Sequence, residues 1–179
     1  IEMEFNPINN YLYCLSKTYL YVVDPLINTL VGTISLSGDP YDMEINDSNG
    51  DVYVSYENLD QIDIWSYNNL LSPVEILNSG STNWPTNSIT RGGKMTYDSF
   101  NSHICITTDA DHIIRVNSSR NIQSSHNIPG LYFGFIFFEQ VTNTILVYNG
   151  TDLLKIEEFG SIDTINIPGQ PFDMLFNNL

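Results

Sequence analysis

Short runs of alternating apolar and polar residues recur along the chain, and polar turns separate them. The segment 3–13 aligns without a gap on the segments 43–53 and 95–105. In each copy, the first run ends in a turn rich in Asn, Asp, Ser and Gly, and a second run follows, as at 11–15 and 51–55. Because strand side chains alternate between two faces, this pattern indicates a β-hairpin.

Two further apolar runs complete each repeat, which has a period of about 40 residues. The third runs are 20–23, 62–65, 113–116 and 153–156, and the fourth are 33–36, 74–77, 122–128 and 162–167. Four short antiparallel strands per period make one blade of a β-propeller. We therefore predict an all-β propeller with four four-stranded blades and the first strand of a fifth, over residues 1–39, 40–91, 92–130, 131–170 and 171–179. A β-sandwich with accidental spacing is the less favoured alternative.

The third strand and turn of the first repeat carry a family resemblance. The stretch 21–34 reads YVVDPLINTLVGTI, and it resembles the YVTN family of β-propeller repeats, with 11–16 and 51–56 in place of that family's second strand. Asp24 suits this turn because its carboxylate can accept backbone hydrogen bonds, and Asn28 suits it because Asn tolerates a left-handed backbone. The likeness weakens along the chain.

The resemblance implies a larger ring, of about seven blades, or an arc that other segments complete. It also implies a secreted, cell-surface or virion protein, since such repeats occur in surface proteins of archaea and bacteria and in structural proteins of large phages. Fold-level likeness does not fix function.

Composition excludes two classes of partner. Six basic residues stand against 21 acidic ones, which gives a formal net charge of −15. Nucleic-acid phosphates and anionic membrane surfaces both need clustered Lys and Arg, so we expect neither as a partner. No apolar stretch approaches the roughly 18 residues of a membrane span, so we expect no membrane insertion.

Acidic loops are the candidate metal ligands. Loops that join second to third strands should lie on one rim of a propeller, and Asp60, Asp109 and Asp111 fall in such loops. Carboxylate oxygens are the ligands that Ca²⁺ takes in proteins, so these residues are candidates for a calcium site, against the alternative of ordinary turns. Otherwise we expect no cofactor. Cys14 and Cys105 fall in blades two apart, so we expect free thiols.

Aromatic residues in the predicted loops are candidates for a binding rim. They could stack on a sugar or contact a protein surface, against the alternative of capping blade ends. These residues are Tyr41, Tyr56, Trp84 and Phe172.

No nucleophile elbow, catalytic triad, phosphate loop or zinc signature occurs in the sequence. The leading hypothesis is therefore a non-catalytic propeller module of an extracellular, cell-surface or virion protein that binds a protein or glycan or acts as a scaffold. One alternative is a Ca²⁺-dependent propeller enzyme, a lactonase or lyase, with the ion in the central channel. Another is a component that assembles with other chains into an array or filament.

Overall fold

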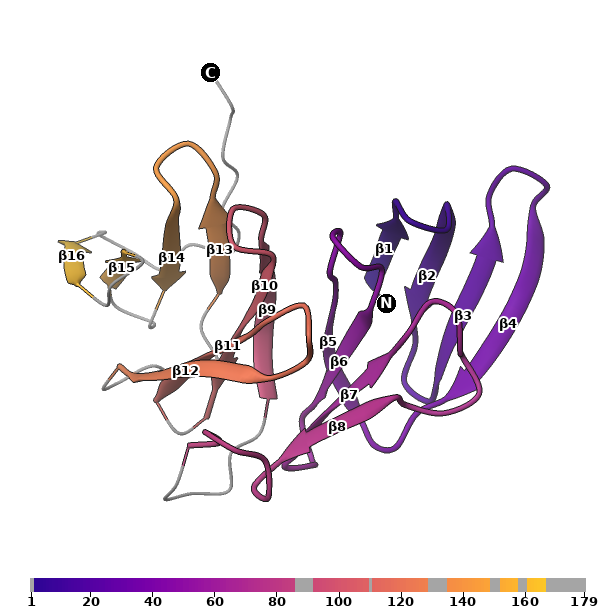
Figure 1. Ribbon diagram of the computed structural model, residues 1–179, viewed down its shortest axis with the longest axis horizontal. Helices are drawn as coiled ribbons and strands as arrows, with labels where there is room; N and C mark the ends of the chain where they lie inside the picture. The colour runs from indigo at the N-terminus through magenta and orange to yellow at the C-terminus, as the bar shows by residue number, and fades with distance from the viewer. Residues whose placement is uncertain are drawn as a thin grey trace.

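A computed structural model of the chain describes residues 2–85, 92–109, 111–128, 135–148, 152–157 and 161–166. Within these ranges all regular structure is β-strand, arranged as four antiparallel four-stranded sheets in which neighbours along the chain are neighbours in the sheet (Figure 1). Blade one holds β1 (Glu2–Asn6), β2 (Tyr11–Leu15), β3 (Tyr19–Asp24) and β4 (Thr29–Ser35). Blade two holds β5 (Pro40–Ile45), β6 (Val52–Tyr56), β7 (Gln61–Trp65) and β8 (Glu75–Asn78).

The second half of the chain repeats this arrangement. Blade three holds β9 (Gly92–Asp98), β10 (His103–Thr108), β11 (His112–Val116) and β12 (Ile122–Asn127). Blade four holds β13 (Ile136–Glu139), β14 (Thr144–Tyr148), β15 (Asp152–Ile156) and β16 (Ile162–Asn166). The prediction of four four-stranded blades is confirmed, while the predicted first strand of a fifth, at 171–179, lies outside the described residues.

The turn between the first two strands shows why the repeat folds alike each time. One repeat position near the end of this turn has a positive φ in all four blades, and the residues are Asn10 (60°), Gly50 (75°), Ser102 (57°) and Asn143 (52°). Asn and Gly accept the left-handed region at low cost, which explains the polar turn column of the sequence.

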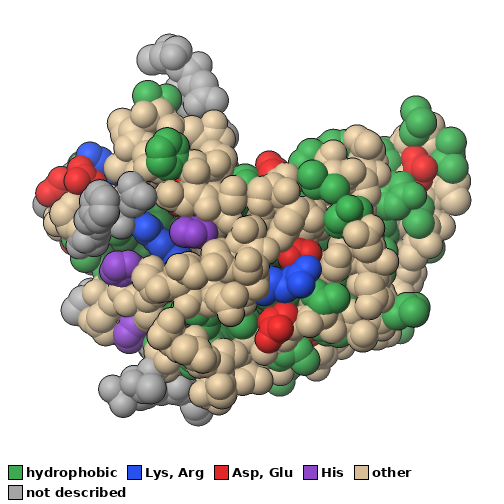
Figure 2. All heavy atoms as spheres, in the orientation of Figure 1, with side chains coloured by type: hydrophobic (Ala, Val, Ile, Leu, Met, Phe, Trp, Pro, Cys, Tyr) green, Lys and Arg blue, Asp and Glu red, His purple; other side chains and the backbone are tan. Residues whose placement is uncertain are grey.

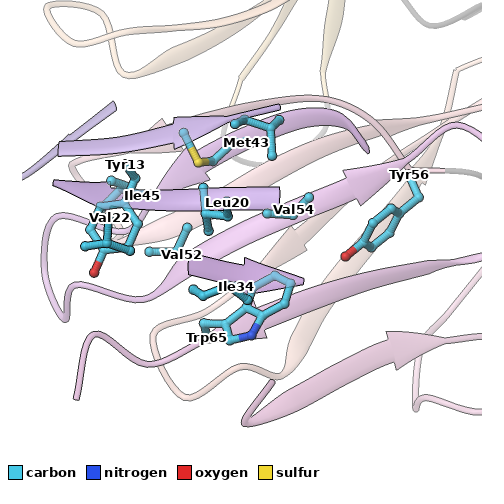
Figure 3. Packing of buried hydrophobic residues seen from close by; sticks show 11 residues of the cluster. Tyr13, Leu20, Val22, Ile34, Met43, Ile45, Val52, Val54, Tyr56 and Trp65 are labelled. Atoms are coloured by element: carbon cyan, nitrogen blue, oxygen red, sulfur yellow. The ribbon is translucent and has the colours of Figure 1, made fainter. Parts of the chain in front are cut away.

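The blades pack face to face through apolar side chains. On blade one, Tyr13, Leu20 and Val22 point from one face of the sheet toward Met43 and Val54 of blade two (Figure 3). Equivalent clusters join blade two to blade three and blade three to blade four. Each fully buried large side chain contributes about 1.5–3 kcal/mol, so these interfaces hold the arc together.

The first strands of the blades lie side by side. Strand β1 contacts β5, β5 contacts β9, and β9 contacts β13, while the later strands fan outward (Figure 1). Among the described residues, no helix is long and apolar enough to cross a membrane. Cys14 and Cys105 are both free thiols, as expected.

Candidate functional site

Charged side chains gather on the first strands, on either side of the repeated Met. Three of them hold one repeat position, immediately before the Met: Glu2, Asp42 and Lys94. Two more lie immediately after it, Glu4 and Glu44. Residues two apart on a strand share a face. The two charged residues that flank Met3 therefore lie on the face of the strand opposite to Met3, and the two that flank Met43 lie opposite to Met43. We call these five residues the inner wall.

Asp42 and Lys94 form the centre of the inner wall. The Lys94 ammonium pairs with one carboxylate oxygen of Asp42, and the other oxygen accepts a hydrogen bond from the Met95 amide at 2.6 Å. Burial and the nearby Glu2 carboxylate raise the pKa of Asp42, against the opposing effect of Lys94. Burial disfavours the charge on Lys94, but Asp42 outweighs this, so the pKa of Lys94 is raised too. The raised pKa values of Asp42 and Lys94 mean that both side chains hold a proton more tightly than free side chains do.

The two glutamates after the Met strengthen this property. Burial, followed by repulsion from Glu2 and Asp47, raises the pKa of Glu4 to about 7. The pKa of Glu44 is raised well above its ordinary value, mainly by burial and then by Glu4, although the Ile45 amide donates to its carboxylate at 3.2 Å. A carboxyl group that titrates near neutral pH can both accept and donate a proton.

Hollows open at both ends of the inner wall. One has a volume of about 400 Å³ and is lined by Glu2, Leu15, Ser16, Lys17, Pro40, Tyr41 and Lys94. The Lys94 ammonium lies 5.3 Å from the centre of the Tyr41 ring, which is a cation–π contact. The other, also of about 400 Å³, is lined by Glu44, Asp47, Thr96, Tyr97, Phe137, Phe138, Glu139 and Gln140. A small molecule in either hollow would therefore lie beside a carboxyl group of the wall.

A further hollow, of about 690 Å³, lies between the outer strands β8 and β12. Its one described guanidinium, that of Arg120, makes two hydrogen bonds to the Asp51 carboxylate at 2.8 and 3.0 Å. None of the five inner-wall residues lines this hollow.

The structure corrects part of the predicted aromatic rim. Tyr56 is fully buried, and its hydroxyl donates to Asp63 at 2.6 Å. Trp84 is 5% exposed and packs in the core between blades two and three. Neither is a rim aromatic, because each fills space between blades. Tyr41 does line the hollow beside Lys94, and Phe172 lies outside the described residues.

The predicted calcium candidates lie on two loops. Asp60 is in the β6–β7 loop, and Asp109 and Asp111 flank the β10–β11 turn, where Asp111 has a φ of 59°. In the described part of the chain, no three His, Cys, Asp or Glu side chains are grouped so that they could hold a metal ion. The calcium assignment to these residues stays a prediction.

Sequence reasoning did not single out the inner wall. The signal was present, since the repeated Met is flanked by Glu2 and Glu4 in one repeat and by Asp42 and Glu44 in the next. Charged residues on both sides of a repeated core position mark one face of a first strand, and first strands of successive blades are neighbours. Acidic residues are also common in the loops, where they favour turn formation, and these obscure the signal of the first strands.

Comparison with known proteins identifies the fold. No protein-family model and no curated protein matches the chain. A catalytically inactive virginiamycin B lyase from Staphylococcus aureus, solved with quinupristin, is 15% identical with a TM-score of 0.72, covering 93% of this chain and 55% of that one. A streptogramin B lyase is 12% identical with a TM-score of 0.73, covering 93% and 54%. The dihydro-heme d1 dehydrogenase NirN is 11% identical with a TM-score of 0.78, covering 96% and 37%.

The chain spans about half the length of the lyases that it resembles. These proteins are enzymes, so the leading prediction of a non-catalytic binding or scaffolding module was wrong: the comparison favours the alternative of a propeller enzyme. Identities this low establish the fold alone. The likeness to YVTN repeats stays a resemblance. The chain is a set of β-propeller blades, and the enzymes named above have the same architecture.

Proposed function

We propose that the chain is part of a propeller enzyme and that the inner wall is its proton-transfer site. The observation that supports this most is the group of half-buried or buried carboxyl groups, those of Glu4, Asp42 and Glu44, whose pKa values are raised above the ordinary carboxyl value, mainly by burial. Raised carboxyl pKa values beside an ammonium group and a hollow are typical of acid–base sites.

The reaction class that fits this wall is an elimination, the chemistry of a lyase. One ionised carboxylate removes a proton from carbon, and the electron pair of that C–H bond becomes a C=C bond as the neighbouring C–O bond breaks. A protonated carboxyl group or the Lys94 ammonium gives a proton to the departing oxygen. Both groups then exchange protons with water. No electrons enter or leave, so the step requires no oxidant or reductant.

The hollow beside Lys94 supports an ester or lactone as the substrate class. Leu15, Pro40 and Tyr41 supply apolar and aromatic surface, while Lys17 and Lys94 are cations that can face a carbonyl oxygen. Lys17 is exposed, and Lys94 is only partly covered. Two of the six basic residues of a chain with net charge −15 thus line one hollow, which favours a substrate with a polar oxygen group at that end.

The calcium alternative is a poor fit to the inner wall. The Asp42 carboxylate is already occupied by the Lys94 ammonium and the Met95 amide. Within the described ranges, the wall does not supply three carboxylates grouped for a cation. In the proposed step, side chains therefore accept and donate the protons.

The test is incubation of the chain with quinupristin and with a panel of lactones, followed by liquid chromatography coupled to mass spectrometry, because chromatography separates a product from a substrate of the same mass. Opening of a ring ester by elimination leaves its mass unchanged, whereas hydrolysis adds one water. We expect conversion without added mass, and loss of conversion in Asp42→Asn and Lys94→Met. Asp39→Asn is the matched control, because Asp39 is an exposed carboxylate just outside β5. No conversion of any compound, or equal rates for all variants, would contradict the proposal.

A further inference from the structure

The first strand of blade four carries aromatic residues where those of blades one and two carry carboxylates. In this strand, Ile136 takes the place of the repeated Met. Phe135, just before β13, therefore holds the repeat position of Asp42, and Phe137 holds that of Glu44. Because β13 lies beside β9 and β9 beside β5, the two phenylalanines continue the inner wall with aromatic instead of charged side chains.

These two phenylalanines are not part of the core. Ile136 and Phe138, which alternate with them, are 9% and 4% exposed and belong to the apolar cluster between blades three and four. Phe135 is 39% exposed, and Phe137 is partly buried. Figure 2 shows further hydrophobic side chains at the surface of the β13–β14 hairpin. Accessible aromatic surface beside a hollow is typical of a binding site.

Phe137 lines the same hollow as Glu44, one of the two hollows of about 400 Å³ at the ends of the inner wall. Thr96 of β9, which lies between β5 and β13, also lines it. The Thr96 hydroxyl accepts a hydrogen bond from the Phe138 amide at 3.3 Å, and this bond holds β13 against β9. An aromatic side chain and a carboxyl group of the proposed proton-transfer site thus open into one space.

The charge of this hollow selects among ligands. Glu44, Asp47 and Glu139 line it, and no Lys, Arg or His of the described residues does. The side chain and amide of Thr142 donate hydrogen bonds to the Glu139 carboxylate and lower the pKa of Glu139, which is therefore ionised at neutral pH. A ligand group with a negative charge is disfavoured here. The edge of an aromatic ring carries positive partial charge, so these carboxylates favour a ring whose face lies on Phe137.

We infer that the hollow between Glu44 and Phe137 binds an aromatic ring of the substrate, and that Phe137 is the residue that determines this specificity. The inference rests on the proposed elimination at the inner wall, and it narrows the substrate class to esters or lactones that carry an uncharged aryl group. An aliphatic group of the same size gains the apolar contact but neither the stacking on Phe137 nor the contact of a ring edge with the carboxylates. The bonds next to the bound ring lie along the inner wall, beside the Glu44 carboxyl group.

Binding of a small aromatic probe tests the inference without any turnover. Benzyl alcohol is titrated into the nitrogen-15-labelled chain, and two-dimensional NMR follows the backbone amides. We expect the largest shifts at Glu44, Thr96 and Phe137, because the ring current of the probe acts on nearby nuclei. Cyclohexylmethanol, the saturated analogue, should bind about 2–10-fold more weakly because it cannot stack. Benzoate, the anionic analogue, should also bind more weakly than benzyl alcohol.

Matched substitutions separate the ring of Phe137 from its bulk. Phe137→Leu keeps an apolar side chain but removes the ring, so benzyl alcohol should bind about 2–10-fold more weakly. Phe137→Tyr keeps the ring and should bind the probe as the parent does. Phe100→Leu is the control, because Phe100 is 70% exposed in the β9–β10 turn and does not line the hollow. This control variant should also bind the probe as the parent does.

Probe binding and turnover distinguish failure of this inference from failure of the proposed function. Equal binding of benzyl alcohol to the parent and to Phe137→Leu overturns the inference, even if the chain converts substrates. If Phe137→Leu does not fold, the parent decides, because shifts confined to residues outside the hollow, or no shifts, overturn it as well. If the probe binds as expected and no ester or lactone is converted, the hollow is a ring-binding site and only the proposed elimination fails.

Turnover adds a second readout of specificity. Where conversion occurs, kcat/KM should be higher for aryl esters than for their cyclohexyl analogues. In Phe137→Leu, kcat/KM should fall for the aryl esters and stay unchanged for the cyclohexyl ones. An unchanged ratio between the two substrate series would overturn the assignment of specificity to Phe137.

Discussion

Two methionines at one repeat position offer a direct test of how the blades hold each other. Met43 is 2% exposed between blades one and two, and Met3 is 62% exposed on the open face of blade one. Met43→Ala removes a buried side chain and leaves a cavity, so we expect a loss of about 3 kcal/mol in the free energy of unfolding. Met3→Ala removes a side chain of which only about a third is covered, so we expect a loss of about 0.8 kcal/mol, a third of the roughly 2.5 kcal/mol that full burial contributes.

The assay is urea denaturation of both variants and the parent chain, followed by the fluorescence of the buried Trp65 and Trp84. The midpoint should fall strongly for Met43→Ala and little for Met3→Ala, with similar slopes. Because both changes delete the same atoms, residue type cancels from the comparison. Equal losses, or a larger loss at Met3, would refute the argument that blade contact rather than residue type stabilises this position.

Three further changes test other contacts. The raised pKa of Glu4 means that the folded state binds the Glu4 proton more tightly than the unfolded state, so the stability that this proton contributes is fully present below about pH 4.5 and is lost as the pH rises through about 7. Glu4→Gln should therefore be more stable than the parent by on the order of 1 kcal/mol at about pH 8, a value reduced for solvent screening. At about pH 4 the two proteins should be equally stable, and urea titrations at both pH values measure the difference. Tyr56→Phe deletes the hydrogen bond to Asp63 and should cost about 1.5–3 kcal/mol in thermal or urea unfolding, with an unchanged stability arguing against a buried bond. Asn46→Ala deletes the hydrogen bond from the side chain to the Ser102 carbonyl at 3.3 Å together with the two that its side-chain oxygen accepts from Ser48, and should cost about 1–3 kcal/mol; an unaltered urea midpoint would show that these bonds contribute nothing.

The fold could be predicted from sequence because its determinants are local and repeated. The Met position and the turn residue with a positive φ, which is Asn10, Gly50 or Ser102, recur at fixed offsets. The first specifies a strand face and the second a left-handed residue. Strand periodicity then gives the blade. These sequence signals can be recognised without knowing which blades are in contact.

The candidate site could not be predicted in the same way, because it depends on distances between blades. Asp42 and Lys94 are 52 positions apart and meet only because β5 and β9 are neighbours. The same dependence on contacts between strands explains why Tyr56 and Trp84 were wrongly predicted to lie on a binding rim. Tyr56 follows the apolar run 51–55 in the sequence and looks like a loop residue, but it is the last residue of β6, and Asp63 on the adjacent strand accepts the hydrogen bond of its hydroxyl and allows full burial.

Carbon-13 NMR titration of the side-chain carboxyl groups tests the central claim most directly, since the proposed site requires carboxyl groups that exchange protons near neutral pH. We predict a midpoint of about 7 for Glu4 and one well above 4.5 for Glu44. Glu139 is the internal control, because hydrogen bonds from Thr142 and Val141 lower its pKa below the ordinary value. Midpoints near 4.5 for both Glu4 and Glu44 would contradict the account, because such groups would be fully ionised at neutral pH and neither could donate a proton.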